Sequence, residues 1–414
     1  MAGKLIEIEE ARRLVLERVA PLGHEPVALR EALGRVLAED VTSADNIPGF
    51  DNSAMDGYAV RSRDTEPATP ERPTRLDIVD EARAGHPASH MVAPMEAIAI
   101  STGAPVPEGA DAVVRVEDTD GAREGKVAIH APVAPGANIR RAGEDIERGE
   151  TVLRSGTTLG PAEIGVLASV GRARAVCARR PSVAVLTTGD ELQEPGETLR
   201  PGAIRNSNSY ALAALVEEAG GELALTEIVG DTREETEAAL DRALSCDITL
   251  VSGGVSVGEH DHVKPALASL GAEEIFWGVA LRPGKPTFFG LAPHRPGAGL
   301  TRNLVFGLPG NPVSSMVAFT LFARPAIRAM LGADPDERRR TTAVFEEDYA
   351  KQPGRAHLIR CKLELAEDGW HARSTGAQGS HVLTSMLDAD ALAIIPSEQG
   401  DVSAGDRVEI ELLR

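Results

Sequence analysis

The feature that most constrains the fold is a regular alternation of strand and helix patterns that begins near residue 182. Buried-strand patterns lie at 182–187, 223–229, 247–252, 274–280 and 304–307, and helix patterns at 209–219, from 232, and at 263–270 and 312–331. Repeated βα units of this length predict a mainly parallel, doubly wound sheet. Ligands of such sheets bind outside the carboxyl ends of the strands, so the loops there are where chemistry is expected.

The first of these loops, Thr187 to Leu192, places the adjacent carboxylates of Asp190 and Glu191 at the end of a strand. Carboxylates in this position suit Mg²⁺ bridging a phosphate, because Mg²⁺ usually takes one or two carboxylates and keeps several waters. An ordinary Gly-Asp turn explains the same residues. The loop by itself leaves both interpretations open.

The second loop runs from Val251 to Asp261 and is rich in glycine. Its glycines allow backbone N–H groups to converge on an anion, and Glu259 and Asp261 stand at the start of the next helix pattern. The loop matches neither the P-loop pattern nor GxGxxG. A glycine-rich loop that follows a strand and ends in carboxylates favours a phosphate site.

The third loop, Gly307 to Ser315, leads into the last helix pattern of this region. Asn311 is suited to the N-cap and Pro312 to the first helical position, so the helix presents free N–H groups and the positive end of its dipole. An anion could bind there. The loop alone favours simple helix initiation over an anion site.

Between the second and third loops, the segment Arg282-Pro283-Gly284-Lys285-Pro286 presents two cations around a rigid turn. The chain as a whole is acidic, with 63 Asp and Glu against 43 Lys and Arg and a net charge of −20 at pH 7. Such a surface repels the phosphates of nucleic acid and argues against general nucleic-acid binding. Two fixed cations in this setting indicate a site for an oxyanion.

Other polar features have structural explanations at least as good as functional ones. Asp231 precedes a capping box, and a carboxylate that stabilises the start of a helix explains it at least as well as a metal ligand does. His260 and His262 lack a third ligand at matching spacing, which favours exposed or supporting roles. The run 338–340, Arg-Arg-Arg, is most simply a solvated turn between domains. GxSxG is absent, so acyl-transfer hydrolysis has no support.

Outside the alternating region the patterns change. Residues 4–40 and 160–171 have helical patterns, whereas 46–145 and the stretch after 340 contain short apolar runs separated by turns, which predicts two small β domains. No apolar stretch approaches the ~18 residues that a membrane span needs.

The cysteines point to a cellular compartment. They are three in number and far apart, at Cys177, Cys246 and Cys361. Neither a disulfide framework nor a zinc site is expected from this spacing, and the reducing cytoplasm is the natural location.

Several motifs stand in a fixed order outside the α/β region. The longest is FDNSAMDGYAV at 50–60, followed by STGA at 101–104, GADAV at 109–113, RRAGED at 140–145 and TGAQGSH at 375–381. Together with the three loops, these motifs resemble the MoeA family, the molybdopterin molybdenumtransferases that include the gephyrin E domain. The resemblance covers nearly the whole chain.

The resemblance implies a fold and an assembly. The fold would be multidomain α/β plus β: a MogA-like doubly wound α/β domain, a discontinuous helical domain and two small β domains. The implied ranges are 1–45 with 146–178 for helical domain I, 46–145 for β-rich domain II, 179–331 for α/β domain III and 332–414 for β domain IV. The implied assembly is an elongated homodimer in which domain II of one subunit faces domain III of the other.

The resemblance also implies a reaction, the insertion of molybdate into adenylylated molybdopterin with Mg²⁺-dependent release of AMP. Glu191, Asp231 and Asp261 would bind Mg²⁺ or orient water. Asp56, Thr102 and Asp145 would complete the catalytic set from across the dimer. The residues implied in substrate binding are Ser252, Gly253, Gly254, Ser256 and Gly258 with Pro309 and Pro312 around the pterin-side phosphate, and Arg282, Lys285, Arg355 and Ser380 around molybdate.

Two positions depart from the family pattern. Gly278 stands where several members have a basic residue, and Arg282 opens the RPGKP motif where Lys is common. The planar fork of Arg can bind an oxyanion bidentately. The sequence does not separate molybdate from the nearly isosteric tungstate.

Two alternative functions follow from parts of the resemblance. A MogA-like molybdopterin adenylyltransferase would share the α/β domain and consume MgATP, but the four-domain layout argues against it. A non-catalytic scaffold of the gephyrin type would need none of the carboxylates at Asp56, Glu191, Asp231 and Asp261. Expected partners of the enzyme are a MogA-type adenylyltransferase and apo-molybdoenzymes.

Overall fold

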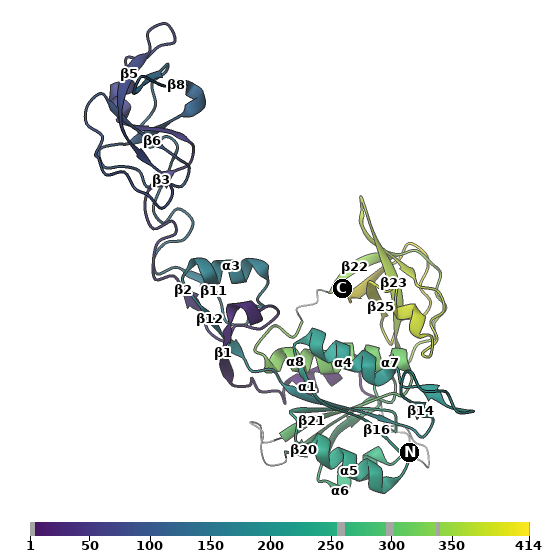
Figure 1. The fold of residues 1–414 in the computed structure, drawn as a ribbon. Helices are drawn as coiled ribbons and strands as arrows, with labels where there is room; N and C mark the ends of the chain where they lie inside the picture. Colours follow the sequence, from purple (N-terminus) through teal and green to yellow (C-terminus); the bar gives the residue numbers. More distant parts are fainter. Residues whose placement is uncertain (1–4, 255–260, 295–301, 337–339, 414) are drawn as a thin grey trace. The chain divides into compact units, whose positions relative to one another are not determined.

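The computed structural model describes residues 5–254, 261–294, 302–336 and 340–413. The chain separates into two compact units, one of Met1–Glu39, Ser155–Gly160 and Ala175–Arg414 and the other of Asp40–Arg154 and Pro161–Arg174 (Figure 1). In the described part of the chain, no helix is both long enough and apolar enough to cross a membrane.

The centre of the first unit is a six-stranded sheet. Its strands in spatial order are β16 (Glu222–Val229), β13 (Ser182–Thr188), β17 (Ile248–Ser252), β21 (Arg302–Leu308), β20 (Phe288–Pro293) and β18 (Glu273–Trp277). The first four are parallel, as predicted. The central residues of β13, β17 and β21 are continuously buried, as expected of strands covered on both faces, whereas those of β16, at the edge of the sheet, alternate between exposed and half-buried. The sequence analysis missed β20, which runs antiparallel to both its neighbours.

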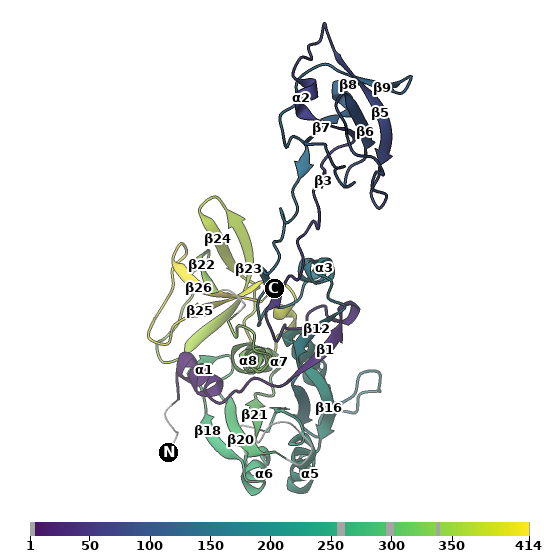
Figure 2. The same ribbon diagram turned by 90° about the vertical axis from the view of Figure 1, so that its left-hand side faces the viewer.

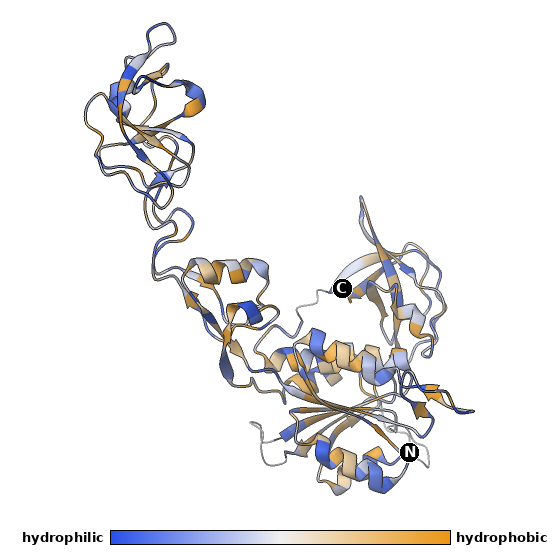
Figure 3. Ribbon diagram, viewed as in Figure 1, coloured by the Kyte–Doolittle hydropathy of each residue, from blue (hydrophilic) through white to orange (hydrophobic). Residues whose placement is uncertain are grey.

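Helices cover both faces of this sheet, and the core lies between them and the strands (Figure 1). One face carries α1 (Ile8–Leu16), α4 (Asn208–Ala219), α7 (Pro312–Ala318) and α8 (Arg324–Met330), and the other carries α5 (Arg233–Ala243) and α6 (Val263–Ser269). The central strands are mainly apolar, whereas the helices mix apolar and polar residues (Figure 3). These layers confirm the doubly wound α/β prediction.

The structure contains the start of α5 and the end of α4 where the sequence predicts them. Thr232 is the N-cap of α5, and its hydroxyl accepts the N–H of Glu235 at 3.2 Å. Helix α4 ends at Gly220, whose φ of 96° is the left-handed conformation that glycine adopts without strain.

One helix prediction was wrong, and another is confirmed in extent but contains an irregularity that was not predicted. The pattern over 4–40 forms only α1 and the short helix η1 (Leu29–Glu31), because Pro21 and Pro26 interrupt it, and β1 (His24–Ala28) lies between and pairs with β12 (Arg174–Ala178). The helix predicted over 312–331 contains a π-helical segment, η3 (Phe319–Ala323), between α7 and α8. Pro325 follows this segment and has no N–H to donate to the preceding turn.

The C-terminal part of the first unit is a second six-stranded sheet (Figure 2). Its strands are β19 (Leu281–Arg282), β23 (Ala356–Ala366), β24 (Gly369–Ser374), β22 (Arg340–Phe345), β26 (Arg407–Leu412) and β25 (Ala391–Ile395), with the short helix η4 (Leu383–Met386) alongside. Its core contains Phe345, Ile359 and Ile410. Strand β19 comes from the segment between β18 and β20, and it pairs in parallel with β23.

Arg340 contradicts the expectation of a solvated turn. Its side chain forms ion pairs with Glu9 (2.8 Å), Glu409 (3.2 Å) and Glu411 (3.5 Å). Burial alone would lower the pKa of Arg340, but the hydrogen bond and charge of Glu9 and the nearby carboxylates raise it. Arg340 therefore ties the start of β22 to α1 and β26, while Arg338 and Arg339 lie outside the described residues.

The second unit is built on a sheet in the order β7 (Ala112–Arg115), β4 (Gly57–Val60), β6 (Glu96–Ile100), β5 (Thr74–Ala82), β9 (Lys126–Ile129) and β8 (Thr119–Arg123). The smaller elements are β2 (Val41–Thr42), β3 (Asn52–Ser53), β10 (Ile139–Arg140), β11 (Thr151–Leu153), α2 (Ser62–Thr65), η2 (Val116–Asp118) and α3 (Pro161–Ser169). A side chain at Gly57 would place its Cβ 1.9 Å from the carbonyl oxygen of Val114, so β4 requires glycine there.

Candidate functional site

A cavity of about 800 Å³ lies where the parallel strands end, and we call it the strand-end cavity. It is lined by Thr188, the last residue of β13, and Gly189; by Ser252, the last residue of β17, with Gly253 and Gly254; and by Pro309 to Pro312 after β21. Glu191, Asp231, Pro286 and His381 also line it, together with β15 (Ile204–Arg205) and the residues up to Asn208. The sheet topology thus brings all three predicted loops to one place.

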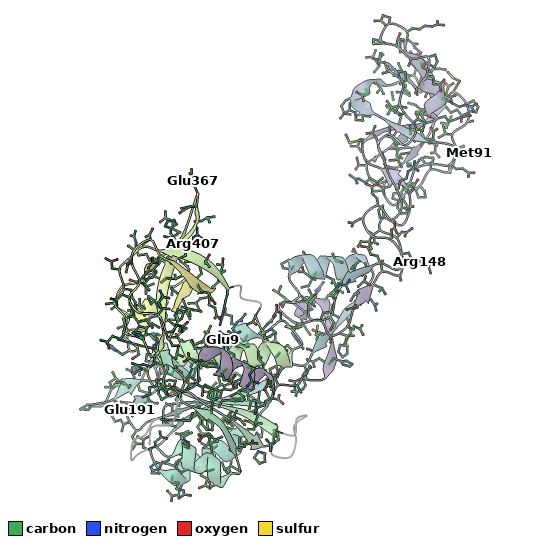
Figure 4. The ribbon with its side chains drawn as sticks, turned by 180° about the vertical axis from the view of Figure 1, so that it is seen from behind. Glu9, Met91, Arg148, Glu191, Glu367 and Arg407 are labelled. Atoms are coloured by element: carbon green, nitrogen blue, oxygen red, sulfur yellow. The ribbon has the colours of Figure 1, made fainter. Side chains whose placement is uncertain are left out.

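The two carboxylates Glu191 and Asp231 reach the cavity from neighbouring loops, and Glu191 is exposed between β13 and β14 (Leu192–Gln193) (Figure 4). The loops are held together by reciprocal bonds. The N–H of Asp190 donates to Asp231 Oδ2 (3.2 Å), and the N–H of Asp231 donates to Asp190 Oδ1 (3.1 Å). A Cβ at Gly189 would lie 2.5 Å from Glu191 Oε2, so glycine leaves the room that this carboxylate occupies.

Asp261 is placed differently from the other two predicted metal ligands. It lies just before α6, does not line the strand-end cavity, and has both carboxylate oxygens shielded from solvent. Across residues 5–254, 261–294, 302–336 and 340–413, no group of three His, Cys, Asp or Glu side chains is arranged to hold a metal ion. Ser256, Gly258 and His260 lie outside the described residues.

Asn208 organises the loops around Ser252, and the sequence analysis missed it. Its side-chain Nδ2 donates to Ser252 Oγ (2.9 Å) and to the carbonyl of Gly310 (2.8 Å), which joins the second and third loops. Its sequence signal is weak, because a polar residue at the start of a helix usually caps that helix.

Gly253, in the second loop, has a φ of 94°, and a Cβ there would lie 2.7 Å from Thr188 Oγ1, so this position requires glycine.

The start of α7 is less open than predicted. Asn311 is the N-cap, but its side chain makes no capping hydrogen bond, and Pro312 stands at the first turn as expected. The N–H of Val313 donates to the carbonyl of Ser380 at 3.1 Å. Ser380 therefore contacts the helix start through its backbone, next to His381 in the cavity wall.

A second cavity of about 850 Å³, which we call the basic pocket, lies between β19 and the segment that leads into β23. Arg282, Lys285 and Arg355, all predicted to bind molybdate, line it together. Lys351 and His357 also line it and were not predicted. Ser380 is not among the lining residues.

The ammonium group of Lys351 is held in place by backbone carbonyl groups. Its ammonium group donates to the carbonyl oxygens of Pro396 (2.7 Å), Ser397 (3.4 Å) and Gln399, which accounts for its three hydrogens. Burial lowers the pKa of Lys351. The backbone N–H of Lys351 donates to Asp401 Oδ1 at 2.7 Å, and Asp401 is the acidic residue in the pocket wall.

His357 stands opposite Arg282 in the β19–β23 pairing and is almost completely buried. Burial, followed by the charges of Arg282, Lys351 and Arg355, lowers its pKa from 6.5 to about 4. The ring is therefore neutral at pH 7, and the positive charge of the pocket comes from Arg and Lys.

In the second unit, two of the three predicted catalytic residues meet. Asp56 Oδ1 accepts hydrogen bonds from the N–H (2.7 Å) and the hydroxyl (3.1 Å) of Thr102. Asp145 is held elsewhere, where its N–H donates to the carbonyl of Ile47 at 3.0 Å. The structure thus pairs Asp56 with Thr102 and leaves Asp145 on another turn.

Family models match the chain in three consecutive segments. They are described as the MoeA N-terminal region (domain I and II) over residues 6–171, a probable molybdopterin binding domain over 184–329, and the MoeA C-terminal region (domain IV) over 342–413. The chain belongs to the MoeA family. The resemblance read from the motifs is thereby confirmed.

Individual members of the MoeA family match over nearly their whole length. The chain is 38% identical to "Molybdopterin molybdenumtransferase 2" of Mycobacterium tuberculosis, over 97% of this chain and 98% of that protein. It is 36% identical to the molybdopterin molybdenumtransferase of Haemophilus influenzae, over 98% of each. The crystal structure of the molybdopterin biosynthesis moeA protein of Pyrococcus horikoshii matches with a TM-score of 0.83 and 35% identity, covering 99% of this chain and all of that one.

Proposed function

We propose that this MoeA-family chain inserts molybdate into adenylylated molybdopterin and releases AMP. Its relatives' names support molybdenum transfer to molybdopterin. The observation that carries the proposal is the turn between Arg282 and Pro286. Lys285 lines the basic pocket and Pro286 lines the strand-end cavity, so a site for an oxyanion adjoins a site that suits a diphosphate.

The strand-end cavity would bind the phosphate end of the substrate. Backbone N–H groups of the loop from Ser252 to Gly258 would cradle the pterin-side phosphate, beside Pro309 and Pro312. Two carboxylates on one cavity, Glu191 and Asp231, fit Mg²⁺, which takes one or two carboxylates and retains waters. When bound, Mg²⁺ would neutralise the diphosphate and polarise its phosphorus.

Glu191 and Asp231 both line this cavity, and one of them would accept a proton from an attacking water. That water would add to the adenylyl phosphorus as the bond to the molybdopterin phosphate breaks, which frees AMP. The buried carboxylate of Asp261 would act from just before α6, either by holding the loop that runs from Val251 to Asp261 or by taking part in metal binding.

The basic pocket would bind molybdate through Arg282, Lys285 and Arg355, and Ser380, which lines neither cavity, would act from beside the start of α7. Guanidinium groups suit tetrahedral oxyanions because they donate two parallel hydrogen bonds. The two dithiolene thiols of molybdopterin would then bind the molybdenum of the held molybdate, and their two protons would leave with one displaced oxygen as water. In a chain of charge −20, these cations would make the potential locally positive.

We further propose a cytoplasmic homodimer in which Asp56, Thr102 and Asp145 complete the site of the partner subunit. The Asp56–Thr102 contact supports a shared role for these two residues. A MogA-type adenylyltransferase would supply the adenylylated substrate, and apo-molybdoenzymes would accept the product.

The deciding experiment incubates the purified chain with adenylylated molybdopterin, Mg²⁺ and molybdate and measures AMP. Molybdate-dependent AMP release is expected, and its absence would refute the proposal. Consumption of ATP with free molybdopterin would instead identify an adenylyltransferase. Binding of a partner protein with no turnover of either substrate would identify a scaffold.

Variants test the assigned roles. Asp56→Ala and Glu191→Ala should each abolish turnover and leave the oligomeric state unchanged, whereas Glu273→Ala, in an exposed ion pair with Arg302, should keep full activity. Mixed dimers of Asp56→Ala and Asp261→Ala should recover part of the activity if the site is shared. No recovery in verified mixed dimers would contradict that geometry.

A further inference from the structure

His357 lines the basic pocket, and Tyr349 lies behind it, outside the lining; neither has a role in the function proposed above. Tyr349 and His357 are hydrogen-bonded, with 3.0 Å between the tyrosine hydroxyl and Nδ1 of the imidazole. The rings pack edge to face at a centroid distance of 5.8 Å and an angle of 80°. Tyr349 is in turn packed edge to face on Phe345 and pairs its backbone with Val402. The pair is therefore held rigidly.

The direction of this hydrogen bond follows from the available acceptors. Among the described residues, Nδ1 of His357 is the acceptor within reach of the Tyr349 hydroxyl, and a half-buried tyrosine hydroxyl normally donates to a partner. Burial raises the pKa of Tyr349, so the hydroxyl keeps its proton to donate. A neutral imidazole that accepts at Nδ1 carries its own proton on Nε2.

The other ring nitrogen of His357, Nε2, is available to a ligand. The ring of His357 lines the basic pocket, yet its Nε2 is neither hydrogen-bonded to a described residue nor sealed from solvent. The cations near it differ in what they can donate, because the ammonium of Lys351 is already taken up by three carbonyls. Lys351 thus contributes charge, whereas Nε2–H contributes a free neutral donor.

We propose that Tyr349 fixes the proton of His357 on Nε2, so that the pocket presents only a donor there and selects a fully deprotonated tetrahedral oxyanion over a protonated one. This inference rests on the proposed function, which places molybdate in this pocket. At pH 7 molybdate and sulfate carry no proton, whereas inorganic phosphate does. A protonated oxygen of the ligand at this position would point its O–H at the Nε2–H of His357, so that neither donor has an acceptor. One buried donor left without an acceptor costs about 1–3 kcal/mol in general, or roughly tenfold in binding.

The test measures binding of sodium molybdate to the full-length protein by equilibrium dialysis at pH 7, with phosphate and sulfate as competitors. In Tyr349→Phe the proton of His357 can move to Nδ1, which turns Nε2 into an acceptor. We expect the preference for molybdate over phosphate to fall about tenfold in Tyr349→Phe, while the preference over sulfate stays the same. Tyr210→Phe, which removes an exposed hydroxyl bonded to Glu194, is the matched control and should change neither ratio.

A spectroscopic measurement makes the test independent of affinity. In protein labelled with ¹⁵N at histidine, the signals of His357 are assigned by their loss in His357→Gln. They should show the Nε2-protonated tautomer in the wild type and a mixture in Tyr349→Phe. A wild-type ring protonated on Nδ1 would overturn the proposal.

The charged groups around His357 offer an alternative cause of the selectivity, which the same measurements test. They are Arg282, Lys285, Lys351, Arg355 and Asp401. If Asp401→Asn lowers the preference over phosphate as much as Tyr349→Phe does, with the tautomer unchanged, carboxylate repulsion sets the selectivity and the proposal is wrong. An unchanged preference in Tyr349→Phe would also overturn it, while AMP release by the wild type would still support the proposed function.

Discussion

Asp247 offers the clearest quantitative test of how the strand-end cavity is supported. It lies just before β17 and is completely buried. Its carboxylate accepts two bonds from the guanidinium of Arg179 (3.0 and 3.1 Å) and two from Ser182, through its N–H and hydroxyl (both 2.8 Å). This one side chain therefore joins the starting ends of β13 and β17, the strands whose far ends carry the first two loops.

In Asp247→Asn an amide N–H₂ group replaces one carboxylate oxygen. This group cannot accept the hydrogen bonds that Arg179 and Ser182 donate. A hydrogen bond to a charged group contributes about 1.5–3 kcal/mol, and the partial exposure of Arg179 places its two bonds at the lower end. We expect the free energy of unfolding to fall by about 3 kcal/mol. Glu227→Gln, which breaks an exposed pair with Arg242, is the control and should cost less than about 1 kcal/mol.

The assay is urea denaturation followed by the fluorescence of Trp277, which lies in β18 of the same sheet, in a Trp370→Phe background. Burial alone would raise the pKa of Asp247, but the hydrogen bonds from Arg179 and Ser182 outweigh it and hold the pKa below 3.8. The fold therefore favours the ionised form, and this stabilisation is present above pH 3.8 and lost as the pH falls through the folded pKa. A loss no larger than that of Glu227→Gln, or one that does not shrink in acid, would refute the reasoning.

Three further predictions concern other parts of the chain. Asn208→Ala removes the bond to Ser252 Oγ and should lower turnover at least about tenfold with an unchanged circular dichroism spectrum; unchanged turnover would show that the loops need no such tie. Lys285→Met should weaken molybdate binding about tenfold in equilibrium dialysis and leave binding of AMP unaffected. The hydrogen bond to Asp368 raises the pKa of His371, so its NMR titration should have a midpoint above 6.5 that falls in Asp368→Asn; the stabilisation is present below pH 6.5 and lost as the pH rises through the folded pKa.

The sequence predicted best those parts of the fold whose cause is local. The parallel strands, the capping box at Thr232 and the glycine end of α4 each depend on a few neighbouring residues. It failed where a single residue changes a longer pattern. Pro21 and Pro26 end a helical pattern that otherwise continues, and Pro325 accompanies a π-helical segment that hydrophobic spacing does not reveal.

The candidate site divides in the same way. That Arg282 and Lys285 line one pocket could be predicted because they share one short motif, and the topology of the sheet is enough to bring Glu191 and Asp231 to one edge. His357 could not, because it joins the pocket only through the register in which β23 pairs with β19. Its neutrality depends on burial and on three cations from different segments, which no local pattern encodes.

Strand β19 has a consequence for the rate at which ligands bind. It leaves the α/β sheet, adds itself to the edge of the C-terminal sheet and returns, and the N–H of Ala356 bonds the carbonyl of Ala280 at 2.7 Å. The two halves of the basic pocket are therefore preorganised by backbone pairing before any anion arrives. Association should then be governed by diffusion and electrostatic steering, with no closing motion of the C-terminal sheet to slow it, and its rate should fall as salt screens the pocket.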